Sequence, residues 1–387
     1  MIINQKQAVD INSRNPIQLN GFDFIEFTTK FPQKIINIFT KFGFVITGRH
    51  QRKNIFLLEQ GKIKFIVNAE ANTDAASFES IHGSGVCGIS FRVKDSNFAL
   101  KEAVKRGAKA VICSDYDLPA IESVGGSKIY LIDRQTSEQF YKSFFEPTGK
   151  HSLAKPKVTY IDHITQNVFK GNMDAWAKFY ECVFNFQEIR FFDIKGKKTA
   201  LRSKALVSPC GKIRIPLNES QDEFSQIAEF LEKYNGEGIQ HIALGCHDIY
   251  SVVGKIKKEI AFQDTPNSYY ELINKRIPIH KENIIALQEL KILIDGGNKE
   301  DGILLQIFTK EIIGPIFFEF IERKGNQGFG EGNFQALFES IELDQMRRGV
   351  LGEFNHNFEQ TAKTKLKHPM LLDSELLPSK EESPIPV

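Results

Sequence analysis

The chain of 387 residues is longer than a single hydrophobic core usually grows, so its length predicts two domains. Its 50 basic and 48 acidic side chains are scattered and leave a formal charge of +2, which argues against a nucleic-acid or anionic-membrane partner. The N-terminal segment lacks the apolar core of a signal peptide, and no apolar run reaches the roughly 18 residues of a membrane span. We therefore expect a cytoplasmic protein without a membrane partner.

The cysteine and aromatic contents narrow the class further. The five cysteines are odd in number and form no Cys-x-x-Cys pair, which indicates reduced core residues and neither a disulfide framework nor a zinc knot. The 33 phenylalanines far outnumber the 9 tyrosines and the single tryptophan. Side chains without a polar tip favour dry apolar cavities over wet binding faces.

In chain order, the first half shows the pattern strand, helix and several strands twice. The first copy has a strand at 23–27, a helix at 32–42 and a hairpin at 57–67. The second copy has a strand at 88–93, a helix at 96–106, and strands at 110–113 and 129–134.

The second half repeats the same order twice more. Its first copy has a strand at 160–165, a helix at 173–182, a strand at 187–193 and a hairpin around Lys197. Its second copy starts at His241 and continues with a helix at 249–258 and strands at 302–308 and 317–323. Four such units predict an α+β protein with two curved half-barrel sheets, each of which encloses a cavity.

Domain boundaries follow from this repeat. We expect an N-terminal domain at 1–150, a polar linker at 151–157, and a C-terminal domain at 158–348. A helix at 333–348 ends the second domain, and the glycines that precede it would allow it to move as a lid or to pack as an ordinary terminal helix. The polar segment 349–387 has no periodicity and reads as a tail.

The two halves differ where metal-binding side chains could lie. The stretch 236–248 repeats the stretch 83–95 with both glycines, the apolar centre and the final aspartate, but His241 stands where the other copy has Gly88. At another strand, Asp-His-Ile at 162–164 corresponds to Asp-Phe-Ile at 23–25, so His163 stands where the first half has Phe24. A duplicated strand that differs in one coordinating side chain indicates a site kept in one half and lost in the other.

The third difference is Glu319, which aligns with Tyr130. Two imidazoles and one carboxylate, one on each of three strands, match the facial triad that binds non-haem Fe(II). Glu319 lies in an apolar strand, where a carboxylate needs a partner, and a metal ion would be one. The alternatives are core histidines and a glutamate paired with a nearby Arg or Lys.

Several longer motifs carry a resemblance to a known family. They are Asp-His-Ile-Thr at 162–165, Gly-Ile-Gln-His-Ile-Ala-Leu at 238–244, Leu-Leu-Gln-Ile-Phe-Thr-Lys at 304–310, Phe-Phe-Glu at 317–319 and Gly-Phe-Gly-Glu-Gly-Asn-Phe at 328–334. In this order and spacing, the chain resembles the 4-hydroxyphenylpyruvate dioxygenases of the vicinal-oxygen-chelate superfamily from about residue 20 to 348.

The resemblance implies an activity and a metal. His163, His241 and Glu319 would hold Fe(2+), and the family's 2-oxo acid substrate binds the same ion and supplies electrons by losing CO2, so no organic cofactor is needed. The family converts 4-hydroxyphenylpyruvate and O2 to homogentisate and CO2 in tyrosine and phenylalanine catabolism. A homo-oligomer, dimer or tetramer, is also implied.

The resemblance further implies a substrate pocket. The residues that would make polar contacts with the substrate are Ser203, Asn218, Gln226, Gln240, Gln306 and Asn333. The residues that would form the apolar walls are Phe308, Phe317, Phe329, Phe334 and Leu337. The resemblance also implies catalytic roles for Gln226, Gln306 and Asn218. Because Gln240 adjoins a ligand on the same strand, it should face away from the cavity unless a bulge turns it.

Three other functions fit parts of the pattern. Hydroxymandelate synthases resemble this family but hydroxylate the benzylic carbon, and Phe334 and Pro216 follow the dioxygenase pattern. Extradiol catechol dioxygenases share the triad but use further acid/base histidines, for which the sequence offers no clear candidate. A metal-free protein of the same superfamily that binds a small aromatic ligand is the non-enzymatic alternative.

Overall fold

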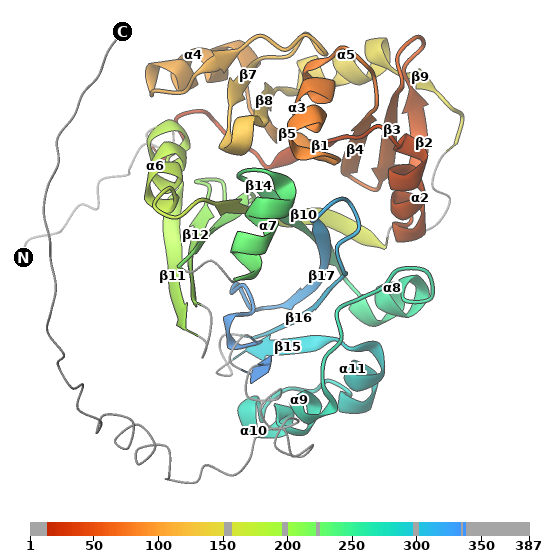
Figure 1. Cartoon of the computed structure of the whole chain (residues 1–387), viewed down its shortest axis with the longest axis vertical. Helices are drawn as coiled ribbons and strands as arrows, with labels where there is room; N and C mark the ends of the chain where they lie inside the picture. The colour runs from red at the N-terminus through yellow and green to blue at the C-terminus, as the bar shows by residue number, and fades with distance from the viewer. Residues whose placement is uncertain are drawn as a thin grey trace, which may run out of the picture.

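The computed structural model describes residues 14–150, 157–195, 200–221, 225–296, 302–333 and 336–337. These residues form two mixed β-sheets, one from each half of the chain, which lie one above the other in Figure 1. Helices cover the sheets, so the predicted α+β class is confirmed.

The first half runs in red to yellow in Figure 1. Its strands are β1 (Phe22–Thr28), β2 (Val45–Arg49), β3 (Ile55–Gln60), β4 (Ile63–Asn68), β5 (Gly85–Arg92), β6 (Ala110–Val111), β7 (Ala120–Glu122), β8 (Lys128–Ile132) and β9 (Glu146–Pro147). Its helices are α2 (Pro32–Phe42), α3 (Asp74–His82), α4 (Ser96–Lys105), the 3-10 turn η1 (Val124–Gly126) and α5 (Arg134–Phe144).

The second half runs from yellow-green to blue. Its strands are β10 (Val158–Val168), β11 (Gln187–Lys195), β12 (Ala200–Val207), β13 (Arg214–Ser220), β14 (Gly238–Cys246), β15 (Leu293–Gly296), β16 (Ile303–Phe308) and β17 (Phe317–Lys324). Its helices are α6 (Met173–Phe184), α7 (Gln226–Tyr234), α8 (Ile249–Ile256), α9 (Asn267–Glu271), α10 (Ile273–Arg276) and α11 (Ile284–Leu290).

Both sheets follow one pairing scheme. In the first, β1 runs parallel to β4 and antiparallel to β5, and β5 runs parallel to β8. In the second, β10 runs parallel to β13 and antiparallel to β14, and β14 runs parallel to β17. Each half therefore consists of two units of strand, helix and three strands, as predicted, and β9 adds an edge strand to the first sheet.

The two halves share one hydrophobic core. Helix α2 begins at a proline and buries Ile35, Ile36, Phe39 and Phe42 on one face, and Gly43 ends it in the left-handed conformation. That face meets the second half, because the core cluster that holds these side chains continues into β17.

The contact with β17 depends on strand alternation. The ring of Phe318 lies 5.2 Å from Phe42 and 5.8 Å from Phe39, and the ring of Phe320 lies 5.2 Å from Phe42. Successive side chains on a strand point to opposite faces, so Phe317 and Glu319 face the interior of the second half-barrel. The first half thus forms the outer support of the strand that carries Glu319.

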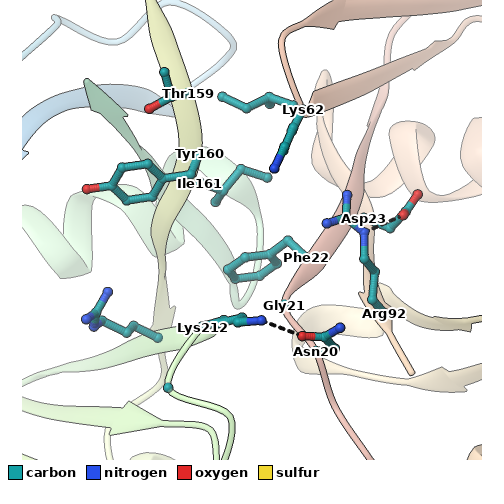
Figure 2. Close-up of a pocket in the computed structure, with 13 residues that line it drawn as sticks. Asn20, Gly21, Phe22, Asp23, Lys62, Arg92, Thr159, Tyr160, Ile161 and Lys212 are labelled. Carbon is teal, nitrogen blue, oxygen red and sulfur yellow. Dashed lines mark hydrogen bonds and ion pairs between the residues drawn. The ribbon is translucent and has the colours of Figure 1, made fainter. Parts of the chain in front are cut away.

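A polar cleft with a volume of about 400 Å³ lies between the halves (Figure 2). Lys212 from the second half donates to Asn20 Oδ1 at 2.6 Å, and Arg92 pairs with Asp23 at 2.8 Å within the first half. The contact between Lys212 and Asn20 is therefore a polar link between the halves at this cleft. The first sheet ends at Pro147 and the second begins at Val158, on either side of the predicted linker. The division into two domains stays a prediction.

Several helices were not predicted, and their sequences show why. Helix α3 buries only Ala75, Phe78 and Glu79, which gives no apolar stripe at helical spacing. Helices α9, α10 and α11, between α8 and β15, have five, four and seven residues, too few for a periodic pattern. The tip of the predicted hairpin at 196–199, the predicted helix at 333–348 apart from Asn333, Ala336 and Leu337, and the tail at 349–387 lie outside the described residues. Within the described ranges, no helix is long and apolar enough to cross a membrane.

Candidate metal centre

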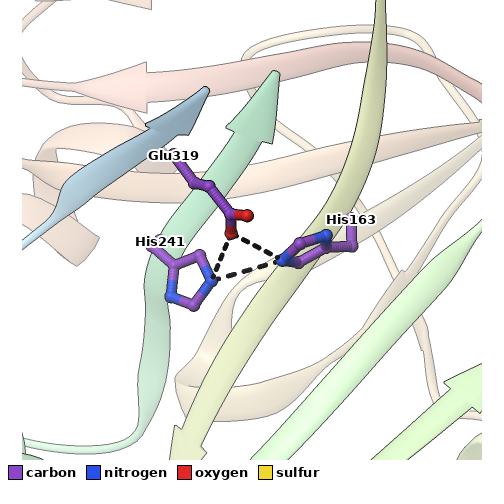
Figure 3. A group of neighbouring side chains, drawn as sticks. All are labelled: His163, His241 and Glu319. Atoms are coloured by element: carbon purple, nitrogen blue, oxygen red, sulfur yellow. Dashed lines mark hydrogen bonds and ion pairs between the residues drawn. The ribbon is translucent and has the colours of Figure 1, made fainter. Parts of the chain in front are cut away.

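His163, His241 and Glu319 converge at the centre of the second sheet (Figure 3). His163 Nε2 lies 3.1 Å from Glu319 Oε2 and 3.4 Å from His241 Nε2, and His241 Nε2 lies 3.6 Å from the same carboxylate oxygen. Only 3% of the His163 and Glu319 side chains and 12% of the His241 side chain are exposed. Three ligand atoms of the predicted types therefore meet in a buried place.

Strand register explains the convergence. On three neighbouring strands, His163 of β10 pairs with Ala243 of β14, which pairs with Glu319 of β17. His241 lies two residues before Ala243 and so shares its face of the sheet. Because Ala243 is small and fully buried, it leaves room above it for the longer side chains on both sides to meet His241.

Two β-bulges orient the histidine rings. In the pairing of β10 with β14, Ile161 opposes Leu244 and His163 opposes Ala243, so Asp162 is an extra residue on β10. A second register shift between the same strands leaves Gln240 as the extra residue on β14. Bulges turn side chains out of strict alternation and are common beside active sites.

Each bulged residue holds the Nδ1 atom of the ligand that follows it. Asp162 Oδ1 lies 2.9 Å from His163 Nδ1, and Gln240 Oε1 lies 3.1 Å from His241 Nδ1. An Nδ1–H donated to these oxygens leaves the Nε2 lone pair of each ring directed at the centre. A bulge of the kind that could turn Gln240 is present, and its side chain contacts the predicted ligand His241. Its contact with a substrate stays a prediction.

The carboxylate of Glu319 supports the assignment of a metal. Its Oε1 is buried and has no hydrogen-bond partner among the described residues. A buried carboxylate oxygen without a hydrogen-bond partner is destabilising, and a divalent cation between the two imidazoles and this carboxylate would satisfy it. The residues therefore fit a metal ion of the kind that binds two nitrogens and one oxygen on one face.

The pKa shifts of the groups at this centre also fit a bound cation. Burial lowers the pKa of His163, but Glu319 and Asp162 outweigh burial and raise it to about 9. Burial and the charge of His163 hold the pKa of His241 well below its ordinary value. Burial would raise the pKa of Asp162, but hydrogen bonds from Arg323 and His163 hold it well below its usual range. The carboxylates beside His163 thus favour a positive charge at this centre, which a divalent cation would also supply.

Three predicted wall residues lie beside the ligands. The ring of Phe317 stacks on His241 at 4.8 Å, and Phe308 lies 6.3 Å from the same ring. Phe329 meets His163 edge to face at 5.4 Å. The structure therefore brings aromatic rings from β16, β17 and the loop after β17 around the two predicted histidine ligands. Phe334 lies outside the described residues, and Leu337 packs against the edge of the core.

Gln306, like Asn333, is a predicted polar residue with a buried side-chain atom that has no partner among the described residues. Its side chain is 2% exposed, and its Oε1 has no partner among the described residues. Asn333 is equally buried, but its Oδ1 accepts from Tyr269 at 2.6 Å and from Arg276 at 3.2 Å, which ties it to α9 and α10. Gln306 is thus free to contact a ligand, whereas the oxygen of Asn333 has protein partners.

The remaining predicted polar residues lie along β12, β13 and α7. Ser203 pairs with Asn218 across the sheet, and Asn218 donates to Asn167 Oδ1 at 3.3 Å. Gln226 is the first residue of α7 and is exposed. Whether these side chains contact a substrate stays a prediction.

The first half shows what replaced the ligands. Phe24 and Tyr130 lie with their rings 5.3 Å apart, and a methyl group at Gly88 would approach the Tyr130 ring at 2.7 Å. The predicted alignment therefore brings together three residues at the positions equivalent to the triad. Aromatic packing fills the space that the predicted metal ligands occupy in the second half.

Sequence reasoning did not place Asp162, Ala243 or Arg323 in the site. Asp162 was detectable in principle, because it precedes His163 as Gln240 precedes His241, with a hydrogen-bond acceptor in both places. Ala243 carries no chemical group, and Arg323 acts through Asp162, so neither had a sequence signal.

Comparisons with known proteins agree with this geometry. The family model described as Hydroxyphenylpyruvate dioxygenase, HPPD, N-terminal matches residues 13–146, and that of the Glyoxalase/Bleomycin resistance protein/Dioxygenase superfamily matches residues 160–271. A 4-hydroxyphenylpyruvate dioxygenase of Legionella pneumophila (strain Corby) is 51% identical over 348 residues, covering 89% of this chain and 99% of the relative. The chain belongs to the 4-hydroxyphenylpyruvate dioxygenase family.

Other relatives of this dioxygenase family carry different names. Hemolysin VllY of Vibrio vulnificus (strain CMCP6) is 48% identical over 354 residues, covering 88% of this chain and 99% of the relative. A solved mutant of 4-hydroxymandelate synthase from Streptomyces coelicolor has a TM-score of 0.72 at 23% identity, covering 85% of this chain and 99% of that one, which shows the shared fold. The comparisons confirm the predicted family, the two half-barrels and an enzyme of the dioxygenase class.

Proposed function

We propose that this enzyme uses Fe(II) to convert 4-hydroxyphenylpyruvate and O2 into homogentisate and CO2. The observation that carries the proposal is the buried set of two imidazole nitrogens and one carboxylate in a chain of this family, in which one Glu319 oxygen has no partner among the described residues. The reaction balances, because both oxygen atoms of O2 enter homogentisate while the 2-oxo acid loses its carboxyl group as CO2.

Iron is the ion that we propose for the centre. A triad of two histidines and one carboxylate on one face leaves positions for a bidentate 2-oxo acid and for O2. A bound Fe(II) ion would supply the redox chemistry that couples loss of CO2 to the reduction of O2. The part of the protein in that chemistry is to fix the ligands and to shape a dry cavity.

The aromatic walls would provide the dry cavity. Phe308, Phe317 and Phe329 surround the two histidines with rings that offer no exchangeable proton. Exclusion of water protects a strongly oxidising site from side reactions and strengthens its electrostatic interactions. We infer that the phenyl ring of the substrate packs among these side chains.

The polar residues would orient the substrate. We assign the unused Oε1 of Gln306 to accept a hydrogen bond from the phenol hydroxyl. Ser203 and Asn218, paired on β12 and β13, are proposed to contact the other polar groups of the substrate. Gln226 would reach the substrate only if its exposed side chain turned inward from the start of α7.

Replacing each ligand tests the metal assignment. His163→Ala, His241→Ala and Glu319→Ala should each abolish turnover and reduce Fe(II) affinity by more than the roughly 10–100-fold that loss of an outer partner costs. Equilibrium dialysis of the apoprotein with Fe(II) under argon measures the affinity, and oxygen uptake measures turnover. Glu311→Ala, which removes an exposed partner of Lys233, is the control and should behave as wild type.

The non-enzymatic alternative predicts a different result. A protein that only binds a small aromatic acid would hold no stoichiometric iron, and its ligand affinity would not change in the three alanine variants. Iron binding that survives all three substitutions would also reject the proposed centre.

Hydroxymandelate synthesis is the alternative chemistry within the same fold. The likeness to the synthase at 23% identity shows the fold alone. Pro216, which follows the dioxygenase pattern, is buried on β13 and pairs with Ala205 of β12. Identification of the product separates the two activities.

A further inference from the structure

Arg323 lies four residues beyond Glu319 on β17 and makes an unusually complete set of contacts. Its Nε donates to Asp162 Oδ2 at 2.7 Å, and its Nη2 donates to Asp162 Oδ1 at 2.8 Å. Only 7% of its side chain is exposed, and the Asp162 side chain is fully buried. This two-point ion pair is therefore screened from water and fixes the carboxylate in one orientation.

The same carboxylate holds a predicted metal ligand. Asp162 Oδ1 accepts from His163 Nδ1 at 2.9 Å while it also accepts from Arg323. A carboxylate behind a metal-binding histidine sets the ring orientation and strengthens the ligand. The orientation of His163 thus depends on Arg323 through one intermediate side chain.

The other nitrogen of the guanidinium binds the segment that follows β17, which we call the hinge loop (residues 325–332). Nη1 donates to the carbonyl oxygen of Asn326 at 3.1 Å and to that of Gly328 at 2.6 Å. These two carbonyls occupy both Nη1 hydrogens. One guanidinium therefore joins the hinge loop to the partner of His163.

The hinge loop returns to the same imidazole. Phe329 follows the bound carbonyl of Gly328, and its ring centre lies 5.9 Å from Arg323 Cζ and 5.4 Å from the His163 ring. His163 is thus held at Nδ1 by Asp162 and covered by Phe329. Arg323 contacts both of these residues.

We propose that Arg323 is a positioning residue that couples the orientation of the His163 ring to the position of the hinge loop. Metal binding, which requires His163 in its fixed orientation, would then stabilise the hinge loop, and displacement of the loop would weaken metal binding. This inference rests on the proposed function insofar as His163 binds the metal.

The first half provides a comparison within the same chain. Asp23, the counterpart of Asp162, pairs with Arg92 at 2.8 Å and also accepts from Tyr141 at 2.6 Å. Arg134, the counterpart of Arg323, instead starts α5 and pairs with Glu138 in a largely exposed contact. An ion pair between the arginine of the last strand and the aspartate of the first strand is therefore found between Arg323 and Asp162, in the half that has the predicted metal ligands.

The test uses Arg323→Lys with Arg92→Lys as its matched control. Lysine keeps the charge but cannot donate to two carboxylate oxygens and two carbonyls at once. Cobalt(II) absorption titrations of the anaerobic apoprotein measure metal affinity, and hydrogen–deuterium exchange measures protection of peptides from residues 325–332 with and without cobalt.

We expect Arg323→Lys to weaken cobalt binding by roughly 10–100-fold, the range typical for an outer partner of a ligand. Wild type and Arg92→Lys should gain protection of the hinge loop on adding cobalt, and Arg323→Lys should lose that gain. Asp162→Asn should weaken cobalt binding similarly, and it serves as the second variant if Arg323→Lys does not fold.

Two results would overturn the inference. One is wild-type cobalt affinity in both Arg323→Lys and Asp162→Asn, and the other is a metal-dependent gain of hinge-loop protection that persists in the folded Arg323→Lys protein. Either result leaves the proposed function intact if wild type binds metal through His163 and turns over. Failure of wild type to bind metal would instead reject the proposed function.

Discussion

Two buried glutamates, one in each half, are stabilised in different ways. Glu319 has an oxygen without a partner among the described residues and two imidazoles beside it, which fits a metal ion. Glu26 accepts from Tyr116 at 2.6 Å, from Tyr130 at 2.9 Å and from Asn68 at 3.0 Å. Glu26 is therefore stabilised by hydrogen-bond donors, whereas the neighbours of Glu319 leave one carboxylate oxygen available to a cation.

Glu26 should make stability depend on pH. Burial raises its pKa above the ordinary 4.5, and nearby Asp115 adds to this, although hydrogen bonds from Tyr116, Asn68 and Tyr130 oppose it. A raised pKa means that the folded state prefers the protonated form, so the stabilisation is complete below pH 4.5 and is lost as pH rises through the folded pKa. Each unit of elevation corresponds to about 1.4 kcal/mol.

Glu26→Gln removes this titration and keeps a side chain of the same shape. Thermal unfolding should show the variant gaining stability relative to wild type as pH rises from 4.5 through the folded pKa of Glu26. Glu138→Gln, at an exposed ion pair, serves as the control and should show no such trend. A difference between Glu26→Gln and wild type that stays constant across this range would contradict the explanation.

That the three predicted ligands come together could be predicted from the sequence, but the orientation of the histidine rings could not. His163, His241 and Glu319 differ in chemical type from Phe24, Gly88 and Tyr130, and that contrast was visible without coordinates. The bulges at Asp162 and Gln240 depend on the pairing between β10 and β14, which a single strand sequence does not reveal.

At the scale of elements, the hinge loop is fixed at several points. Arg323 binds two of its carbonyls, Asp295 accepts from the Gly332 N–H at 2.9 Å, and Gly330 lies directly against the Gln306 side chain. Gly330 has a φ of +77°, and a methyl group there would overlap the Gln306 amide. The loop therefore needs glycine both for its backbone conformation and for close approach to a predicted substrate contact.

Gly330→Ala should lower turnover by at least about 10-fold, because even a shift of about 1 Å at a substrate-positioning group is costly. The matched control is Gly107→Ala, with a φ of +101° and no atom within 4 Å of the added methyl group. The control should lose about 1 kcal/mol of stability and keep its activity. Steady-state kinetics and thermal unfolding of both variants measure these effects, and equal activities would contradict the role given to Gly330.

Several long elements were predicted well, but the eleven-residue helix α5 and the short connecting helices were not. The helix predicted at 173–182 extends over Met173–Phe184, and the strand predicted at 317–323 extends over Phe317–Lys324. Helix α7, whose first residue is Gln226, was missing from the predicted units. Gln226 is exposed at the start of this helix, so a sequence motif alone could not show in which direction its side chain points.

At the scale of the whole molecule, the half without ligands still supports the site. Phe318 and Phe320 leave the strand on the face opposite Glu319 and pack on α2 of the first half. The sequence showed an apolar strand around Glu319, but it did not show that Phe318 and Phe320 pack against the first half of the chain. The shared core predicts that the halves unfold together.

Phe318→Ala should destabilise both halves. Removing a buried phenylalanine typically costs about 3–5 kcal/mol, and its ring contacts Phe27, Phe39 and Phe42 of the first half. Denaturant-dependent hydrogen exchange should show peptides of β1 and β17 losing protection in a single step. Phe98→Ala, at a side chain that is 45% exposed, is the control, and separate transitions for the two sheets would contradict a shared core.

The central claim concerns what the enzyme makes. Protein loaded anaerobically with Fe(II) is mixed with 4-hydroxyphenylpyruvate and ¹⁸O₂, and the organic product and released CO2 are measured by mass spectrometry. We predict homogentisate that carries both labelled oxygen atoms, one in its carboxylate and one in its new ring hydroxyl, with one CO2 for each homogentisate. Hydroxymandelate as the product, or unchanged substrate from folded protein that has bound iron, would contradict the account.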